Sequence, residues 1–133
     1  MTIQYSTTHR TNNVTDIVTV AGATAYILIY SGSVPATCAT AASGTLLASL
    51  PCSSTIGTVT SGVLTFSTIT PAATGSAGTA GYWRLCTSSA GTTVVAQGTA
   101  AVSAADMNFA GGIIWTLGEN ITVSSFTITA TGA

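Results

Sequence analysis

Residues 78–98 read GTAGYWRLCTSSAGTTVVAQG, and this stretch decides the fold. Two runs rich in aromatic and β-branched residues flank a Ser-Ser-Ala-Gly connection, which predicts a β-hairpin. Gly91 can adopt the positive φ that a short hairpin loop often needs. Side chains alternate along a strand, so Trp83 lies on one face and Tyr82 and Cys86 lie on the other. Because both faces carry apolar bulk, we expect the first strand of this hairpin at the centre of a sheet.

Outward from the hairpin, short strand patterns are separated by turn residues. They cover residues 24–30, 45–50, 56–60, 63–69, 106–109, 113–115 and 121–130. Residues 71–80 are nearly all small and predict a flexible loop. About eight short strands with turn signals between them predict an all-β fold, an antiparallel β-sandwich of the jelly-roll type. We expect a single domain over residues 1–133, because neither half could bury a core alone.

One helix is predicted over residues 7–21, after a short extended arm at residues 1–5. Its apolar residues follow the i, i+3, i+4, i+7 spacing of a helix face, namely Val14, Ile17, Val18 and Ala21. Ser6 or Thr7 can cap the start, and Gly22 stands where a C-terminal glycine cap belongs. The many threonines and asparagines are poor helix formers, so a loop with one helical turn is the alternative.

The last strand has a break in its pattern. Ile121 and Val123 share one parity, whereas Phe126 and Ile128 share the other. A β-bulge at residues 124–125 would bring all four side chains to one face, and this is the arrangement we expect. The alternative is a strand that crosses from one buried environment to another.

Charge is scarce in this chain. Of its 133 residues, 47% are hydrophobic and only 4% are charged, whereas an ordinary soluble domain has about 25% charged residues. There is no lysine, and the charged residues are Arg10, Arg84, Asp16, Asp106 and Glu119. A net charge of −1 provides little repulsion between molecules, so self-association or docking is easy. This composition favours a protein that works inside an assembly. A neutral, threonine-rich β domain without that role is the alternative.

Several partners are disfavoured by composition. Two arginines cannot form the basic surface that nucleic acid needs. The longest apolar runs are far shorter than the roughly 20 residues of a membrane-spanning helix. Residues 1–10 lack the apolar segment of a secretory signal, so we expect folding in a cytoplasm.

The three cysteines are an odd number, so at least one is free or pairs with another chain. Cytoplasmic folding favours thiols for Cys38, Cys52 and Cys86. A Cys38–Cys52 disulfide is the alternative. No zinc-binding spacing is present, and we expect no metal or cofactor.

No catalytic motif emerges from the sequence. His9 is the only histidine and stands near the start of the predicted helix, where a surface role is simpler than catalysis. The three carboxylates are scattered at presumed turns and in the helix, where solvated or capping roles are common. Arg84 lies inside a strong strand, so we expect it to be buried and paired with Asp16, Asp106, Glu119 or a backbone carbonyl. We therefore expect a protein that is not an enzyme, although a small hydrolase is a remote third hypothesis.

Aromatic residues admit two interpretations. Tyr26, Tyr30, Trp83 and Trp115 could form a stacking platform for a sugar, but aromatics in a small β protein are more often core or interface residues. The strand at residues 26–30 is apolar on both faces, yet a chain of this size has a thin core. We therefore expect one face to contact a second copy or a larger assembly. The interface candidates are Tyr26, Leu28, Tyr30 and Trp83.

Segments along nearly the whole chain resemble a known family. They are residues 4–10 leading to Gly22, residues 29–36, 44–48, 78–85 with Gly98, Asp106-Met107 and residues 123–129. This pattern resembles small virion structural proteins of tailed bacteriophages, and within them the capsid decoration or cement type. The resemblance implies a jelly-roll-like domain, no catalysis and assembly on a protein lattice. It brings no specific contact residues with it.

Two functions follow from the resemblance. The first is a cement protein, a homo-oligomer on the outer capsid surface that is made in the host cytoplasm and clamps neighbouring major capsid subunits. The second is a tail or fibre component with a receptor-binding role. A receptor binder should have a concave aromatic pocket, whereas a cement protein should have flat apolar patches.

Overall fold

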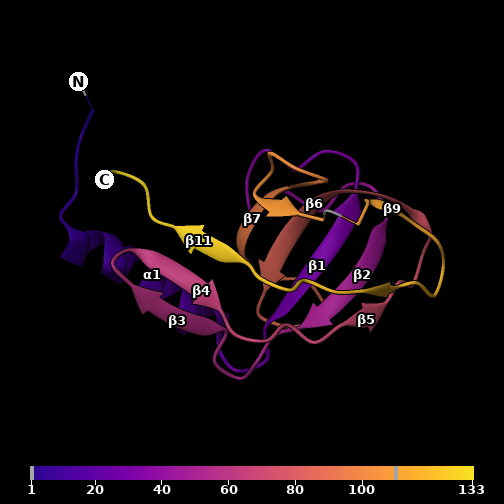
Figure 1. Cartoon of the computed structure of the whole chain (residues 1–133), viewed down its shortest axis with the longest axis horizontal. Coiled ribbons are helices and arrows are strands. Elements are labelled where there is room, and N and C mark those ends of the chain that lie inside the picture. The colour runs from indigo at the N-terminus through magenta and orange to yellow at the C-terminus, as the bar shows by residue number, and fades with distance from the viewer. Residues whose placement is uncertain (1, 110) are drawn as a thin grey trace.

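The computed structural model describes residues 2–109 and 111–133, and within them the chain is mostly β with one short helix (Figure 1). The all-β prediction is confirmed at this level. The elements in chain order are α1 (Thr7–Ala21), β1 (Tyr26–Ser31), β2 (Leu46–Pro51), β3 (Gly57–Thr60), β4 (Val63–Phe66), β5 (Ala72–Ala73), β6 (Gly78–Cys86), β7 (Val94–Ala101), β8 (Met107–Asn108), β9 (Ile114–Trp115), β10 (Asn120–Ile121) and β11 (Thr127–Thr129).

The predicted hairpin forms the centre of the main sheet. Strands β6 and β7 pair antiparallel, with Trp83 opposite Gly98 and Arg84 opposite Gln97. The strand order is β2-β1-β6-β7-β8, and β9 also pairs with β6. Strand β6 therefore lies between β1 and β7, as expected for a strand that is apolar on both faces. Gly91 lies within the connecting loop and has φ of 69°, as predicted.

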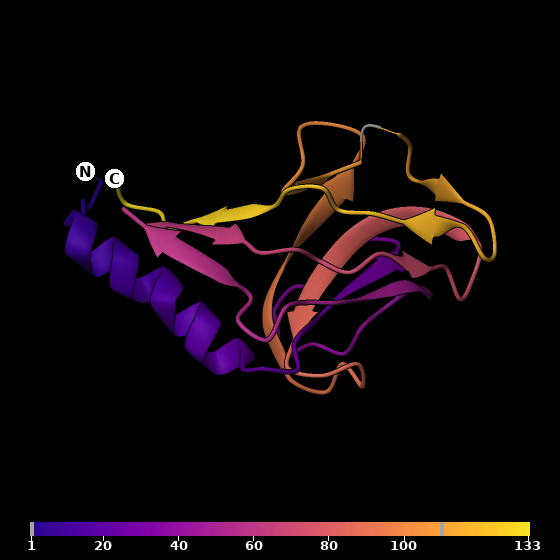
Figure 2. The same ribbon diagram turned by 60° about the horizontal axis from the view of Figure 1, so that its bottom comes forward.

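Two smaller sheets complete the β structure. Strands β11, β4 and β3 form a three-stranded antiparallel sheet, and β10 pairs with β5. Helix α1 runs along the β3–β4 hairpin, at the end of the molecule where both termini lie (Figure 2). The amide of Tyr5 donates a hydrogen bond to the carbonyl of Gly132 at 2.7 Å, which joins the two ends of the chain.

The main core lies on one face of the main sheet. It joins that sheet to α1, to the three-stranded sheet and to the segments around β9 and β10. Its buried members include Val14, Ile27, Ile29, Leu50, Leu64, Phe66, Trp83, Leu85, Trp115, Ile121 and Phe126. Helix α1 and the last strand contribute to the same core as the central hairpin. The core is therefore formed by segments that are far apart in the sequence.

The opposite face of the main sheet is covered by the chain itself. Leu28, Tyr30, Tyr82 and Cys86 form a second buried cluster there. The connection from residue 32 to residue 45 is bonded across this face through Pro35, Thr40 and Ser43. The alternation predicted for the hairpin is confirmed, since Tyr82 and Cys86 lie in this cluster and Trp83 lies in the main core.

Helix α1 has the bounds predicted from the sequence. The side chain of Ser6 caps it by accepting a hydrogen bond from the amide of His9 at 3.2 Å. At the other end Gly22 has φ of 73°, and its amide donates to the carbonyl of Val18 at 3.3 Å. Val14 and Ala21 are buried, so a narrow apolar stripe is enough to hold a helix with poor intrinsic propensity.

Three expectations about strands need correction. Residues 71–80 are not wholly a loop, because β5 and the start of β6 lie within them. Strands β7 and β8 pair in parallel, so the main sheet is mixed rather than wholly antiparallel. The strand expected over residues 121–130 is broken into β10, which pairs with β5, and β11, which pairs with β4.

The predicted bulge at residues 124–125 is wrong. A bulge needs one continuous ladder, whereas the chain here changes partner between β10 and β11. The change of partner lets Ile121, Val123 and Phe126 all turn into the main core, with Ile128 packed against it. The chain does cross from one partner strand to another, but the four side chains share one core, so the alternative with two buried environments is not observed either.

Candidate functional site

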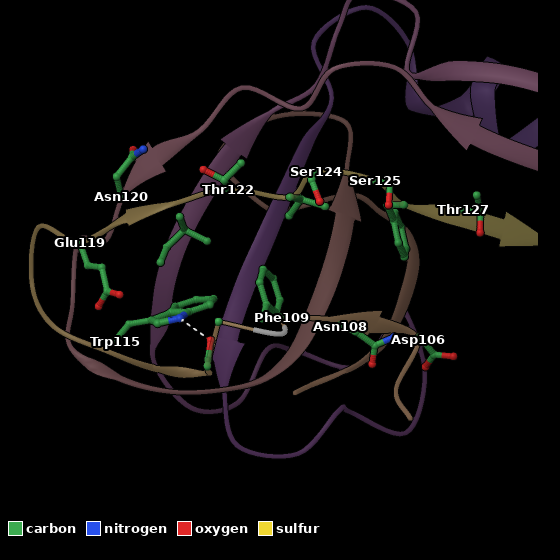
Figure 3. Close-up of a pocket in the computed structure, with 15 residues that line it drawn as sticks. Asp106, Asn108, Phe109, Trp115, Glu119, Asn120, Thr122, Ser124, Ser125 and Thr127 are labelled. Carbon is green, nitrogen blue, oxygen red and sulfur yellow. Dashed lines mark hydrogen bonds between the residues drawn. The ribbon is translucent and has the colours of Figure 1, made fainter. Parts of the chain in front are cut away.

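A groove of about 530 Å³ lies between residues 119–127 and residues 106–115. Figure 3 shows Thr122, Ser124 and Ser125 along one wall, with Phe109 and Trp115 across from them. A volume of this size is in the range of sites that bind small molecules or peptide side chains.

Apolar side chains form the floor of the groove. Ile121 at the end of β10 lines it, as do Val123 and Phe126 from the segment between β10 and β11. Phe109 and Trp115 pack edge to face, with ring centroids 5.1 Å apart and planes at 83°. The indole Nε1 of Trp115 donates to the carbonyl of Gly112 at 3.1 Å, which fixes the ring. The floor is therefore preformed, and only 4% of Trp115 is exposed.

Polar residues form the rim, and their only ionisable side chains are acidic. Asp106 stands at one end, where its Oδ2 accepts hydrogen bonds from the amide of Thr99 at 2.8 Å and from its hydroxyl at 3.0 Å (Figure 3). Glu119 stands at the other end, where its Oε2 accepts from the amide of Thr116 at 2.9 Å (Figure 3). Neither arginine lines the groove. Two of the three carboxylates of the chain thus give this groove a negative potential.

A second hollow of about 380 Å³ adjoins the first, since the two share Asp106, Phe126 and Thr127. Trp83 lines it, and its indole Nε1 is buried without a hydrogen-bond partner among the described residues. Asp106 and Trp83 pack closely against Gly98, because a Cβ there would stand 2.7 Å from Oδ2 of Asp106 and 2.9 Å from Cζ2 of Trp83. A buried indole N–H without an acceptor is costly, so it marks a place where an acceptor would be stabilised.

The interface candidates lie mostly inside the molecule. Leu28, Tyr30 and Trp83 are buried in contacts with the chain itself, and only Tyr26 presents an exposed part to a partner. Tyr30 and Tyr82 stack with ring centroids 5.0 Å apart and planes at 7°. Of the four aromatics considered for a stacking platform, Trp115 lines the groove and Trp83 lines the second hollow, whereas Tyr26 and Tyr30 line neither, so the four do not form one platform.

Arg84 is buried, as predicted, with 3% of its surface exposed. Its Nη2 donates to the backbone carbonyl of Thr40 at 2.7 Å, which was one of the expected kinds of partner. Its Nε has no partner among the described residues, and the same holds for Oε1 of Gln97, the residue opposite it in β7. The guanidinium therefore holds the connection from residue 32 to residue 45, called the covering connection below, against the main sheet.

All three cysteines are free, so the alternative Cys38–Cys52 disulfide is not formed. Burial raises the pKa of the Cys52 thiol to about 11, with a backbone hydrogen bond at Ile27 acting in the opposite direction. Burial also raises the pKa of Cys86, against the lowering effect of the Arg84 charge. Neutral thiols are poor nucleophiles and poor metal ligands at neutral pH.

His9 is exposed near the start of α1, and its ring centroid lies 4.8 Å from that of Tyr5. Within residues 2–109 and 111–133, no group of three or more His, Cys, Asp or Glu side chains is placed to hold a metal ion. In the same residues, no helix is both long enough and apolar enough to cross a membrane.

Sequence reasoning missed the groove. Its residues come from the turns and short strands between 106 and 127, and the strand patterns predicted there do not show which segments lie opposite one another. The one available signal was the parity change between Val123 and Phe126, which we interpreted as a bulge. No family model, curated protein or solved structure matches this chain.

Proposed function

We propose that this chain is a non-enzymatic structural protein of a tailed-phage virion, a capsid decoration or cement protein that binds the assembled head from outside. One observation carries the proposal, an exposed apolar tip formed by Ile114 and Leu117. Ile114, in β9, is 78% exposed, and Leu117, on the turn that follows β9, is 70% exposed. Large apolar side chains held in water are typical of a surface that is covered in an assembly.

The place of the tip supports docking at one end. Strand β9 lies at the end of the molecule opposite the two termini (Figure 1). The low charge of the chain removes the repulsion and desolvation that would oppose burial of such a tip. The partner would be the major capsid protein lattice. A ligand that binds only the assembled lattice stabilises it by mass action.

The remaining parts of the proposal follow from this role. The protein would be made in the host cytoplasm, act on the outer capsid surface as a homo-oligomer, and bind neither nucleic acid nor membrane. We also propose that the main sheet and the three-stranded sheet face each other across the main core as a sandwich of the jelly-roll type. This sandwich would be antiparallel apart from the β7–β8 pair.

Binding of purified heads by surface variants tests the proposal. Ile114→Asp and Leu117→Asp should each weaken binding about tenfold or more, because an anchor residue at the centre of an interface contributes more than 1.4 kcal/mol. Val20→Asp is the matched control, since Val20 is 57% exposed but lies on α1. Equal binding by all three variants would contradict a docking role for the tip.

A receptor-binding tail or fibre component is the second candidate, and the groove favours it. A concave site with an aromatic floor is the feature expected of a receptor binder. If the chain is a fibre component, blocking the groove should abolish adsorption of the phage to its host and leave the stability of the head unchanged. Comparing these two readouts for one blocked variant separates the candidates.

A further inference from the structure

We propose that the groove between β8 and β11 binds an extended peptide segment of another protein by strand addition. This goes beyond the virion role, because a segment of suitable chemistry would bind the isolated protein as well. The segment would be neutral or basic and would carry apolar side chains at alternate positions.

Two unpaired sheet edges meet at this groove. Strand β8 is the last strand of the main sheet, and β11 is the last strand of the three-stranded sheet. Asp106 and Asn108 line the groove beside β8, and Thr127 lines it from β11. A strand at a sheet edge offers a row of free N–H and C=O groups, which is a template for another strand.

The segment between β10 and β11 adds further free backbone. Among the described residues, no backbone hydrogen bond joins residues 122–125 to another part of the chain. All four of these residues line the groove. Unpaired backbone groups beside an apolar floor are the combination that a bound strand satisfies, because its main chain bonds the edge while alternate side chains fill the floor.

Charge selects the occupant further. Asp106 and Glu119 mark the two ends of the groove, and neither arginine borders it. A peptide with Lys or Arg at its ends would therefore be attracted, and an acidic one repelled. This attraction should weaken as salt is added, since both carboxylates are on an exposed rim.

Two other occupants fit the groove less well. A sugar would stack on an aromatic face, but Trp115 and Phe109 pack edge to face and are buried. The arm at residues 2–5 of the same molecule lies at the end away from β9 (Figure 1), where the amide of Tyr5 is already bonded to the carbonyl of Gly132.

The test uses amide hydrogen exchange on the full chain with a set of synthetic seven-residue peptides. Each peptide alternates apolar residues with threonine between two terminal lysines. Binding should slow exchange at residues 122–125 by about tenfold or more, because new backbone hydrogen bonds protect these amides. The same peptides N-methylated on alternate residues, or ended with glutamates, should give little protection.

A matched pair of variants locates the site. Gly111 borders the groove and Gly75 does not, and at both a Cβ would meet no atom within 4 Å. Gly111→Trp should therefore block the peptide without unfolding the protein, whereas Gly75→Trp should leave binding unchanged.

Three outcomes would overturn the proposal. The first is that no peptide of the set protects residues 122–125. The second is that a neutral hexasaccharide protects these residues while the peptides do not. The third is protection that rises with protein concentration when no peptide is present, which would assign the groove to a second copy of this chain.

Discussion

Arg84 donates a hydrogen bond to the backbone carbonyl of Thr40, with 2.7 Å between Nη2 and the oxygen. The two residues lie 44 positions apart, and their bond ties the central strand of the main sheet to the connection that covers it. This buried guanidinium meets a carbonyl, and among the described residues no carboxylate is bonded to it. This arrangement orders a stretch of small residues that has no strand or helix of its own.

Removing the guanidinium should therefore loosen the packing of the covering connection on the main sheet. We expect Arg84→Ala to lower the free energy of unfolding by about 2–4 kcal/mol, from the lost side-chain volume and the unsatisfied carbonyl. Arg84→Met should cost less, because it keeps most of the volume and removes an unneutralised buried charge. Urea unfolding measures both. A loss below about 0.5 kcal/mol for Arg84→Ala would show that the bond to Thr40 has no structural weight.

Gly98 should tolerate no side chain. A Cβ there would stand 2.7 Å from Asp106 Oδ2 and 2.9 Å from Trp83 Cζ2, so Gly98→Ala should destabilise the protein by about 1–3 kcal/mol. Gly75→Ala is the control, because a Cβ at Gly75 meets no atom within 4 Å. Thermal unfolding of the two variants gives the comparison. Equal midpoints would mean that Asp106 moves away freely.

The hairpin and the helix could be predicted from local pattern alone. The alternation around Trp83 and the glycine at position 91 depend on neighbours in sequence, as do the caps Ser6 and Gly22. The sequence therefore correctly predicted that Trp83 lies on one face of the hairpin and that Tyr82 and Cys86 lie on the other.

The groove and the broken last strand could not be predicted in this way. Whether residues 121–129 keep one partner depends on where β4 and β5 end, and those ends are set by packing across the core. Parallel pairing of the two-residue strand β8 also leaves no local signal, because its register comes entirely from β7. The hydrogen bonds between Thr99 and Asp106 could not be predicted either, because the turn between β7 and β8 that brings the two residues together has no clear sequence signal.

The spacing between Val123 and Phe126 should matter more than the serines that fill it. Deleting Ser124 would pull Phe126 away from Trp83, whose ring centroid lies 4.9 Å from that of Phe126. We expect a loss of about 3–5 kcal/mol, comparable to truncating a buried Phe. Ser124→Ala should change stability by less than about 0.5 kcal/mol, because Ser124 is exposed. Denaturant unfolding measures the stability of both variants. A deletion that leaves the free energy of unfolding unchanged would contradict this prediction.

The raised pKa of the half-buried Cys52 thiol should make the protein less stable in alkali. The pKa of Cys52 is about 11 in the folded chain against 9.0 for an unperturbed thiol. Its contribution to stability is therefore complete below about pH 9 and is lost as the pH rises towards 11, because only the unfolded chain releases the proton in that range. Cys52→Ala should flatten the fall in stability over this interval. An unchanged slope in urea unfolding at several pH values would contradict the assignment to Cys52.

Labelling should rank the three cysteines by access. Cys38 is exposed and should react with an alkylating reagent in the folded protein, whereas buried Cys86 should react only after unfolding. Mass measurement without reductant follows the order of labelling. Rapid labelling of Cys86 under native conditions would show that the covering connection opens readily.

The number of copies of this chain in each virion tests the proposed function most directly. Quantitative mass spectrometry of purified virions should find many copies, in a fixed ratio to the major capsid protein, and removing the chain should lower the temperature at which heads open. Only a few copies per virion, with heads of unchanged stability, would contradict the capsid decoration role and assign the chain to the tail or its fibres.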